Sequence, residues 1–393
     1  MKRVLILGGA GAIGSRAIGA ALACSAAHEI VVADLSHDAA AQAAAHHPGR
    51  AVPLQLDVFD EAALRTAMRG VDAVLNCAGP FFRTSLPCLR AAIAERRIYI
   101  DVCDGWDTTR DALALDGAAR AAGIPAIIGL GASPGITNLL ARIAAAELDV
   151  CDEIVTGANL DPGAAVGGHG LPGRAVHWLR QLGGRVEVWR DGRRAPVDAL
   201  QALRLALPGT GARLLHTIGH PEPLTLPRTL TGLKHASHVL ALDRAEAALA
   251  EGLSERVSAG RLTVERAAAM VENPGRRPLE LRLRVLAARC GRRPTDTPPL
   301  FAYATGERHG VRRRVAAWIT RLPPGGAAGA AASALAVGME LALLHRLDRT
   351  GVSAPEDIVD PHVFFEEFAA SATPRGTAPS PLIQIASEPE VTA

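Results

Sequence analysis

The chain has 393 residues, more than one compact core normally holds, so we expect two domains. Hydrophobic residues make up 49% and charged residues 21%, as in ordinary globular proteins. The formal net charge of +2 gives no electrostatic reason to expect nucleic acid or an anionic membrane as a partner.

Strands alternate with helices over the first 130 residues. The expected strands are 3–7, 29–33, 51–56, 72–76, 98–102 and 125–129, and the clearest helices are 12–24, 61–69, 85–95 and 107–122. This alternation forces right-handed crossovers and a parallel sheet. Six strands match the two halves of the dinucleotide-binding fold, so we predict an α/β Rossmann domain with a doubly wound parallel sheet over residues 1–132.

The pattern is weaker from 133 to 326, where we expect a second, mixed α/β domain. The expected elements are a helix at 136–147, a strand at 154–160, a flexible glycine-rich loop at 163–173, a hairpin of 186–189 with 193–197, a strand at 279–287 and a pair of strands at 301–307 and 311–319. The hairpin is indicated by Asp191-Gly192, and the strand pair turns at His309-Gly310.

The C-terminal part is expected to be a long helix at 327–347, then a short helix near Phe364 and Phe365. The Pro/Ser/Thr-rich tail 372–393 is expected to be disordered. Polar residues and glycine interrupt the apolar run 325–344, which favours a packed helix over a membrane span.

The six cysteines are scattered and form no CxxC pair and no zinc-ligand spacing, so we expect free thiols and no metal. The first residues run directly into a strand and lack the apolar region of a signal peptide. We therefore expect a cytoplasmic protein.

A dinucleotide site is predicted at the first turn. Gly9-x-Gly11-x-x-Gly14, with Ala12 and Ile13 between the last two glycines, follows a strand and opens a helix. The glycines permit a tight turn, close approach of the backbone to a pyrophosphate and close packing of helix on strand. The helix N-terminus then attracts the phosphates.

Asp34 ends the second strand, where a carboxylate binds the adenine ribose hydroxyls. No arginine follows closely, so NAD is favoured, although His37 leaves NADP open. Asp57, after the third strand, is either an adenine contact or a strand-end cap. The loop after the fourth strand, Cys77, Gly79 and Pro80 with Phe81 and Phe82, is expected to border the nicotinamide.

Four stretches together, GGAGAIGS, VLNCAGPFFRTSLPCLRAAI, YIDVCDGWDTT and GLGASPGITNLLA, resemble the saccharopine dehydrogenase (reductase) family. The loop GASPGITN is closer to the pattern of its lysine 6-dehydrogenase members, and carboxynorspermidine dehydrogenases share the layout. The resemblance is firm over residues 1–145 and continues loosely through TIGHPEPLTLPRTLTGLKH and GVSAPEDIVDPHVFFEEFA.

The resemblance implies a Rossmann domain, a second α/β domain that binds substrate, a homodimer, and a segment 327–371 that returns to the Rossmann domain. It implies NAD(P)-dependent hydride transfer at a carbon bonded to nitrogen, in an amino acid or a related amine. The reaction is either dehydrogenation of an amine or reduction of an imine.

Such a reaction needs a proton donor and a fixed substrate. Loop arginines that could bind a substrate carboxylate are Arg83, Arg174 and Arg228. Asp101 and Asp104, after the fifth strand, could anchor an ammonium or carry a proton, and their closeness could raise one pKa.

Histidine is the natural proton donor near neutral pH, and His169, His216 and His220 lie in the predicted second domain. His220 is our candidate acid, with His169 as a substrate contact. Glu222 is a candidate for binding the substrate amine, and Lys234 is a possible acid or substrate contact.

Two other function classes are alternatives to this reaction. A short-chain alcohol dehydrogenase needs a Tyr-x-x-x-Lys pair, and neither Tyr99 nor Tyr303 has lysine four residues on. A non-catalytic NAD-binding sensor of the same fold remains the alternative.

Overall fold

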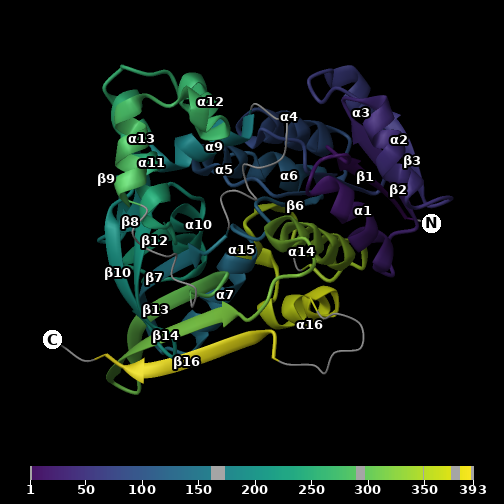
Figure 1. Ribbon diagram of the computed structural model, residues 1–393. Helices are drawn as coiled ribbons and strands as arrows, with labels where there is room; N and C mark the ends of the chain where they lie inside the picture. Colours follow the sequence, from purple (N-terminus) through teal and green to yellow (C-terminus); the bar gives the residue numbers. More distant parts are fainter. Residues whose placement is uncertain (1, 161–172, 289–296, 348, 373–380, 391–393) are drawn as a thin grey trace. The chain divides into compact units, whose positions relative to one another are not determined.

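The computed structural model describes residues 2–160, 173–288, 297–347, 349–372 and 381–390 (Figure 1). The chain divides into two compact units. Unit 1 comprises Met1–Leu139 and Arg321–Leu382, and unit 2 comprises Leu140–Thr320 and Ile383–Ala393. Each unit is built on its own sheet.

Unit 1 contains a parallel sheet of seven strands in the order β15-β6-β5-β4-β1-β2-β3. The strands are β1 (Arg3–Leu7), β2 (Glu29–Asp34), β3 (Ala51–Gln55), β4 (Ala73–Asn76), β5 (Ile98–Asp101), β6 (Pro125–Ile127) and β15 (Gly351–Ser353). All six predicted strands are present, in the order of the Rossmann fold. The prediction of a doubly wound α/β domain is confirmed, and β15 is an unpredicted seventh strand.

The burial of these strands follows from their sequences. β1 and β4 are apolar and buried along almost their whole length, as expected of strands covered on both faces. β3 is at one edge of the sheet and contains Pro53, which cannot donate to a neighbouring strand. The sequence therefore distinguishes the buried central strands from the edge strand β3.

Helices connect the parallel strands of unit 1. They are α1 (Gly14–Ala23), α2 (His37–Ala45), α3 (Glu61–Arg69), α4 (Phe81–Ala94), α5 (Trp106–Leu113) and α6 (Asp116–Ala122). The single helix expected at 107–122 is thus two helices, with a break at Ala114 and Leu115. α4 begins at Phe81, directly after Pro80, so the phenylalanines expected in a loop lie in its first turn.

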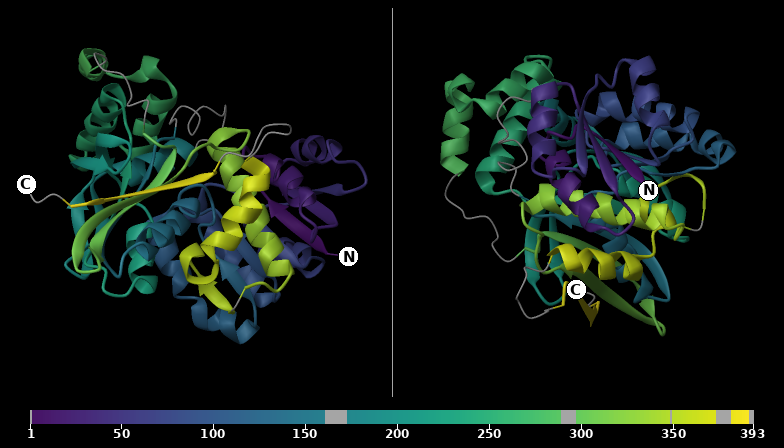
Figure 2. Two further views of the ribbon diagram at one scale, coloured as in Figure 1. Left: turned by 90° about the horizontal axis from the view of Figure 1, so that it is seen from below. Right: turned by 90° about the vertical axis from the view of Figure 1, so that its right-hand side faces the viewer.

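The C-terminal part of unit 1 packs against its N-terminal part. α14 (Gly326–Leu343) packs on α1, and Figure 2 shows it beside α16 (Pro361–Ala372), which carries Phe364 and Phe365. α14 is long and apolar enough to cross a membrane by length and composition, but 78% of it is buried inside the structure. It is therefore well accounted for as a core helix of this unit.

A hydrogen bond joins two segments that carry the family resemblance, one after β6 and the other after β15. Asn138, at the start of α7 (Ile136–Ala146), accepts a bond from the Gly135 amide and donates to Glu356 Oε2, each at 2.8 Å. Glu356 is fully buried in α15 (Pro355–Ile358). This bond fastens the returning C-terminal segment to the loop after β6.

Unit 2 contains a mixed sheet in the order β10-β11-β12-β7-β13-β14-β16, with β8 beside β12 and β9 beside β8. Its strands are β7 (Val150–Ala158), β8 (Arg185–Arg190), β9 (Arg193–Asp198), β10 (Ala202–Leu207), β11 (Gly211–Thr217), β12 (His235–Leu240), β13 (Leu300–Arg308), β14 (Val311–Ile319) and β16 (Ile383–Pro389). Both predicted hairpins are present. Their turn residues Asp191, Gly192, His309 and Gly310 have φ of 51°, 71°, 52° and 74°.

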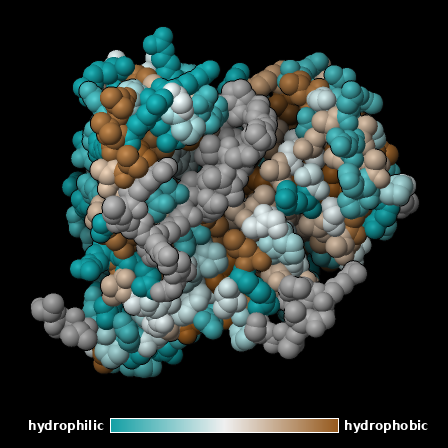
Figure 3. Space-filling model, viewed as in Figure 1, coloured by the Kyte–Doolittle hydropathy of each residue, from teal (hydrophilic) through white to brown (hydrophobic). Residues whose placement is uncertain are grey.

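The helices of unit 2 that the structure describes include α9 (Gly173–Leu182), α10 (Glu222–Thr229), α11 (Arg244–Ser258), α12 (Val264–Glu272), the short 3₁₀ helix η1 (Pro274–Arg276) and α13 (Leu279–Ala288). The strand predicted at 279–287 is wrong, because this segment is α13. Only Leu281 and Val285, four residues apart, are buried. Arg284 bonds Glu251 and Glu255 of α11 at 2.8 and 2.9 Å. Figure 3 shows hydrophobic surface over α12 and α13 at the upper left.

The prediction of a disordered tail is wrong for residues 383–389. They form β16, which pairs with β14 from Ile319↔Ile383 to Arg313↔Pro389. β14 would otherwise be an open edge, and Arg314 and Glu388 add an ion pair at 2.8 Å. A polar composition therefore did not prevent pairing with an available strand.

Candidate functional site

The glycine turn after β1 has no room for a side chain at Gly8, Gly9 or Gly14. Gly8 has φ of +70°, and a Cβ there would lie 2.7 Å from the Ala78 Cα. A Cβ on Gly14 would lie 2.2 Å from the Gly8 carbonyl oxygen, and one on Gly9 would lie 2.6 Å from Val32 Cγ1. Glycine therefore lets the turn, β2 and the loop after β4 meet closely.

The same turn presents backbone donors. Among the described residues, the amides of Ala12, Ile13 and Gly14 have no acceptor, and Ile13 caps α1 without a side-chain bond. Helix N-termini leave such amides for an external partner, and the helix dipole favours an anion. The residues therefore fit a dinucleotide diphosphate at the start of α1.

Asp34 lies at the end of β2 beside this turn. Its Oδ2 accepts a hydrogen bond from the Ala10 amide at 3.0 Å. Ser36, two residues on, caps α2 by accepting a bond from the Ala39 amide at 3.3 Å. Asp57 is exposed and accepts the Phe59 amide at 2.9 Å, which matches the strand-end cap. Asp34, but not Asp57, is thus fixed against the glycine turn.

The loop after β4 contacts the glycine turn through Ala78. Asn76 Oδ1 accepts the Ala78 amide at 3.0 Å, and its amide nitrogen donates to the Tyr99 hydroxyl at 3.0 Å. Gly79 is exposed and has open space where a Cβ would be. Burial, with a smaller contribution from the nearby Asp101, raises the pKa of the neighbouring Cys77 thiol to about 12, so the thiol is neutral near pH 7.

Arg83, proposed to bind a substrate carboxylate, lies exposed in the first turn of α4. Its guanidinium carbon is 5.0 Å from the centre of the Phe59 ring, a cation–π contact within unit 1. Phe81 and Pro80 precede it and are half-buried.

Asp101 ends β5 and is 1% exposed. Its Oδ1 accepts the amides of Cys103 and Gly129 at 3.0 and 2.8 Å, and its Oδ2 accepts the Tyr99 hydroxyl at 2.9 Å. Burial raises the pKa of this carboxyl, opposed by these bonds. We expected the neighbouring Asp104, which is half-buried in the next loop, to raise this pKa. The main cause is instead the burial of Asp101 itself.

In unit 2, His220, Glu222 and His238 form a buried cluster. Glu222 is 0%, His238 1% and His220 5% exposed. Glu222 Oε2 bonds His220 Nδ1, and its Oε1 lies 3.2 Å from His238 Nδ1. The two imidazole rings stack with centres 4.1 Å apart and planes 18° apart. One carboxylate therefore holds two parallel histidines.

Charge in this cluster is set by competing effects. Burial alone would raise the pKa of Glu222, but His220 and His238 together lower it well below the ordinary carboxyl value. Burial lowers the pKa of His238, against the attraction of Glu222. Glu222 is thus an anion near neutral pH, and its bond to His220 Nδ1 leaves Nε2 of that ring for another partner.

The three atoms that could bind metal in this cluster lie within 4.8 Å of one another. Two histidines and one glutamate are a known ligand set for zinc. The stacked rings and the bonds from both Nδ1 atoms to one carboxylate instead fit a hydrogen-bonded network, so we assign no metal here.

The other described residues predicted in the second domain are not members of this cluster. His216 is buried on β11, and burial lowers its pKa. Lys234 is exposed just before β12, where its carbonyl accepts the Gly192 amide at 3.0 Å, and Arg228 is exposed near the C-terminal end of α10. Arg174 lies in α9. His169 lies outside the described residues.

The similarity to a known family covers the site in unit 1. Residues 4–127 match the family model described as the saccharopine dehydrogenase NADP binding domain. Over these residues the chain is similar to that domain family. The resemblance predicted from the sequence is therefore confirmed here, and the domain binds NAD(P). No curated protein matches the chain.

Solved structures extend the similarity of fold. Saccharopine dehydrogenase (L-Glu forming) from Saccharomyces cerevisiae, in apo form, is 15% identical over 94% of this chain and 96% of that chain, with a TM-score of 0.60. GenD2 from gentamicin A biosynthesis, in complex with NAD, is 14% identical over 61% and 65%, with a TM-score of 0.34. DesIV (dTDP-glucose 4,6-dehydratase) from Streptomyces venezuelae, with NAD and TYD bound, is 21% identical over 32% and 54%, with a TM-score of 0.27. The chain thus shares the fold of that saccharopine dehydrogenase.

Sequence reasoning missed His238 as a partner of Glu222 in this saccharopine dehydrogenase-like chain. The two are 16 positions apart, and the parallel pairing of β12 with β7 sets His238 opposite Thr156, whose hydroxyl lies 2.9 Å from His238 Nδ1. The alternation in HASHVL indicates one inward face for β12, but only the pairing of strands identifies what His238 meets there.

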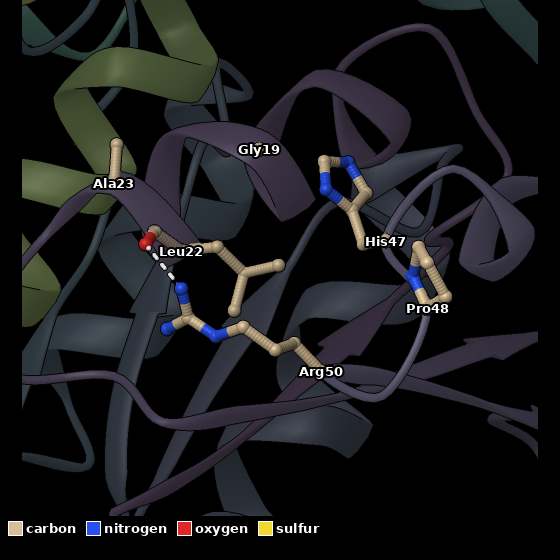
Figure 4. A pocket seen from close by; sticks show the side chains of 6 residues that line it. All are labelled: Gly19, Leu22, Ala23, His47, Pro48 and Arg50. Carbon is tan, nitrogen blue, oxygen red and sulfur yellow. Dashed lines mark hydrogen bonds between the residues drawn. The ribbon is translucent and has the colours of Figure 1, made fainter.

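A pocket of about 300 Å³ on unit 1 lies away from the glycine turn, between α1 and the loop before β3 (Figure 4). Figure 4 shows Arg50 pointing at the Leu22 carbonyl. The guanidinium donates to Leu22 and Ala27 carbonyls at 3.1 and 2.9 Å. Its donors fasten the end of α1, so we assign no ligand to this pocket.

Proposed function

We propose that this chain is an NAD(P)-dependent oxidoreductase that acts on a carbon–nitrogen bond of an amino acid or a related amine. The observation that carries the proposal is the glycine turn, with its free amides and Asp34, inside a saccharopine dehydrogenase NADP binding domain. The fold shared with a saccharopine dehydrogenase supports the same reaction class.

Each part of the turn has a role in holding the dinucleotide. The amides of Ala12, Ile13 and Gly14 would bind the diphosphate, and Asp34 would bind the adenine ribose. Gly79 offers an uncrowded backbone at the carboxyl edge of the sheet. When bound, the nicotinamide supplies or accepts the hydride.

For the proton we propose His220. Its Nδ1 is bonded to Glu222, so its Nε2 can accept or donate a proton. Glu222 is a positioning residue under this proposal, because it is fully buried and both its oxygens face histidines. This replaces the sequence-based role of Glu222 as a direct amine ligand.

The proposal is tested by incubating purified protein with NAD or NADP and a panel of amines, and with the reduced cofactors and mixtures of amino acids with keto acids. Turnover, read as nicotinamide absorbance, is the expected result with at least one pair. Cofactor binding without turnover across the panel would favour the NAD-binding sensor.

The proton role is tested with His220→Gln, which should lower kcat by about 100-fold or more, within the range for general acid–base groups. His235→Gln is the matched control, because His235 lies on β12 outside the cluster and is 44% exposed. Glu222→Gln should shift the pH profile of kcat rather than only its height. Equal activity of the two histidine variants would contradict the role.

A further inference from the structure

A second candidate site lies at the opposite edge of the sheet in unit 1. It is a cavity of about 880 Å³ whose lining includes the basic residues Lys2, Arg96, Arg97, Arg120, His345 and Arg349. Among the described residues that line it, Asp72 is the one acid. Nothing in the proposed reaction uses this cavity.

The topology separates this cavity from the glycine turn. Lys2 precedes β1, Arg97 precedes β5 and Thr350 precedes β15, so the cavity lies at the amino ends of the parallel strands. The glycine turn follows the carboxyl end of β1. Five residues of strand separate the two edges, about 17 Å at 3.3 Å per residue.

The positive charge in the cavity is only partly neutralised. Lys2 pairs with Asp72 at 3.2 Å, and Arg120 pairs with Asp116 at 2.8 Å. Among the described residues, Arg96, His345 and Arg349 have no acidic partner. Three basic side chains therefore remain available to a ligand.

Arg97 adds a buried donor. Its Nη2 donates to the Arg69 carbonyl at 3.0 Å, but its Nε is buried and has no acceptor within the part of the chain that the structure describes. A buried guanidinium donor without a partner is unfavourable. A bound anion would supply the missing acceptor.

Arg96 and His345 adopt a left-handed backbone conformation, which is unfavourable for residues other than glycine. Arg96 and His345 have φ of 55° and 54°, directly after the ends of α4 and α14, where glycine is usual. A basic side chain interacts well with one helix C-terminus. That effect does not account for two such helix ends meeting Lys2, Arg120 and Arg349 around one cavity.

We propose that this cavity binds a small organic anion with two or more phosphate or carboxylate groups. Its volume is within the range of about 300–1,000 Å³ for small-molecule sites. Guanidinium groups bind both kinds of anion through paired N–H donors. The ligand would connect the amino ends of β1, β5 and β6 with His345, Arg349 and Thr350, and so stabilise the return of the chain to β15.

The test uses the full chain with tripolyphosphate and citrate as probes, measured by calorimetry and thermal unfolding at low ionic strength. The variant Arg96→Gln/Arg349→Gln removes two unpaired charges that line the cavity. Arg90→Gln/Arg266→Gln is the control, because both arginines are exposed, lie outside the cavity and carry the same total charge. Binding of tripolyphosphate alone identifies a phosphate ligand, and binding of citrate alone a carboxylate ligand.

At least one probe should raise the unfolding temperature of the unmodified protein, with an affinity that falls as salt rises. The cavity variant should bind that probe at least about 10-fold more weakly, equivalent to 1.4 kcal/mol, while the control binds normally. NADH should not displace the probe. Binding of neither probe, equal binding by both variants, or displacement by NADH would overturn the proposal. None of these outcomes depends on the oxidoreductase activity.

Discussion

Asp34 Oδ2 accepts the backbone amide of Ala10 at 3.0 Å, which joins the end of β2 to the glycine turn after β1. This bond fixes the carboxylate beside the place where the turn would hold a diphosphate. A carboxylate in this position binds the two ribose hydroxyls of NAD and repels the 2′-phosphate of NADP. The relationship therefore bears on which cofactor the domain prefers.

Asp34→Ala should weaken NADH binding by about 10-fold or more, the loss of one or two hydrogen bonds to a charged group. NADPH binding should change less or improve, because a negative charge is removed. Fluorescence titration with both cofactors measures the ratio. A variant that weakens both equally would show that Asp34 only supports the turn.

Gly14→Ala should strongly reduce cofactor binding and lower the unfolding temperature, because the new Cβ would lie 2.2 Å from the Gly8 carbonyl oxygen. Gly117→Ala is the control, since no atom lies within 4 Å of its Cβ position and it lies in α6, outside the glycine turn. Thermal unfolding with and without NADH compares the two. Unchanged binding by the Gly14 variant would be inconsistent with this geometry of the turn.

Two variants of Asp101 test whether the carboxylate at the end of β5 has a structural or a chemical role. Asp101→Ala should cost about 3 kcal/mol, because two buried amides lose their acceptor. Asp101→Asn keeps one oxygen for both amides, so it should unfold within about 1 kcal/mol of the unmodified protein. If the Asn variant is stable but inactive, Asp101 has a role in the reaction that its hydrogen bonds do not explain.

Acid should destabilise the fold through His216 and His238. Burial lowers the pKa of both, so below about pH 6.5 the unfolded chain binds protons that the folded chain does not. Their stabilising effect is full above that pH and is lost as the pH falls toward the folded pKa. Denaturant unfolding between about pH 7 and pH 5 should show the decline.

The variant His216→Leu should lessen that decline, because it removes one of the two groups. His362→Leu, at an exposed position, is its control. A slope that is the same in all three proteins would mean that His216 does not contribute.

The first half of the fold could be predicted because its signals are local. Each of the six predicted strands is an apolar run that ends at glycine or a polar residue, and the parallel topology follows from the helices between them. The strand Gly351–Ser353 could not be found this way, because three residues carry no period and pair with β6 from 226 positions away, as in Gly351↔Pro125.

The structure of unit 2 was harder to predict from the sequence, because pairing between distant segments decides it. Alternating leucines at 279–287 fit a strand by period, yet Arg284 and its two glutamates hold the segment as a helix on α11. His220 and Glu222 were found as polar residues in one short motif. Their partner His238 depends on how β12 pairs, which the motif does not contain.

The central claim is tested most directly by mixing well-folded protein with NAD(P)H and a panel of imines formed from amino acids and keto acids, and following cofactor oxidation. The account predicts either oxidation of NAD(P)H that requires both the amine and the carbonyl compound, or, with the oxidised cofactor, reduction that requires an amine. Calorimetry that shows no binding of either nicotinamide cofactor, or binding with no oxidation or reduction on any amine or imine, would contradict it.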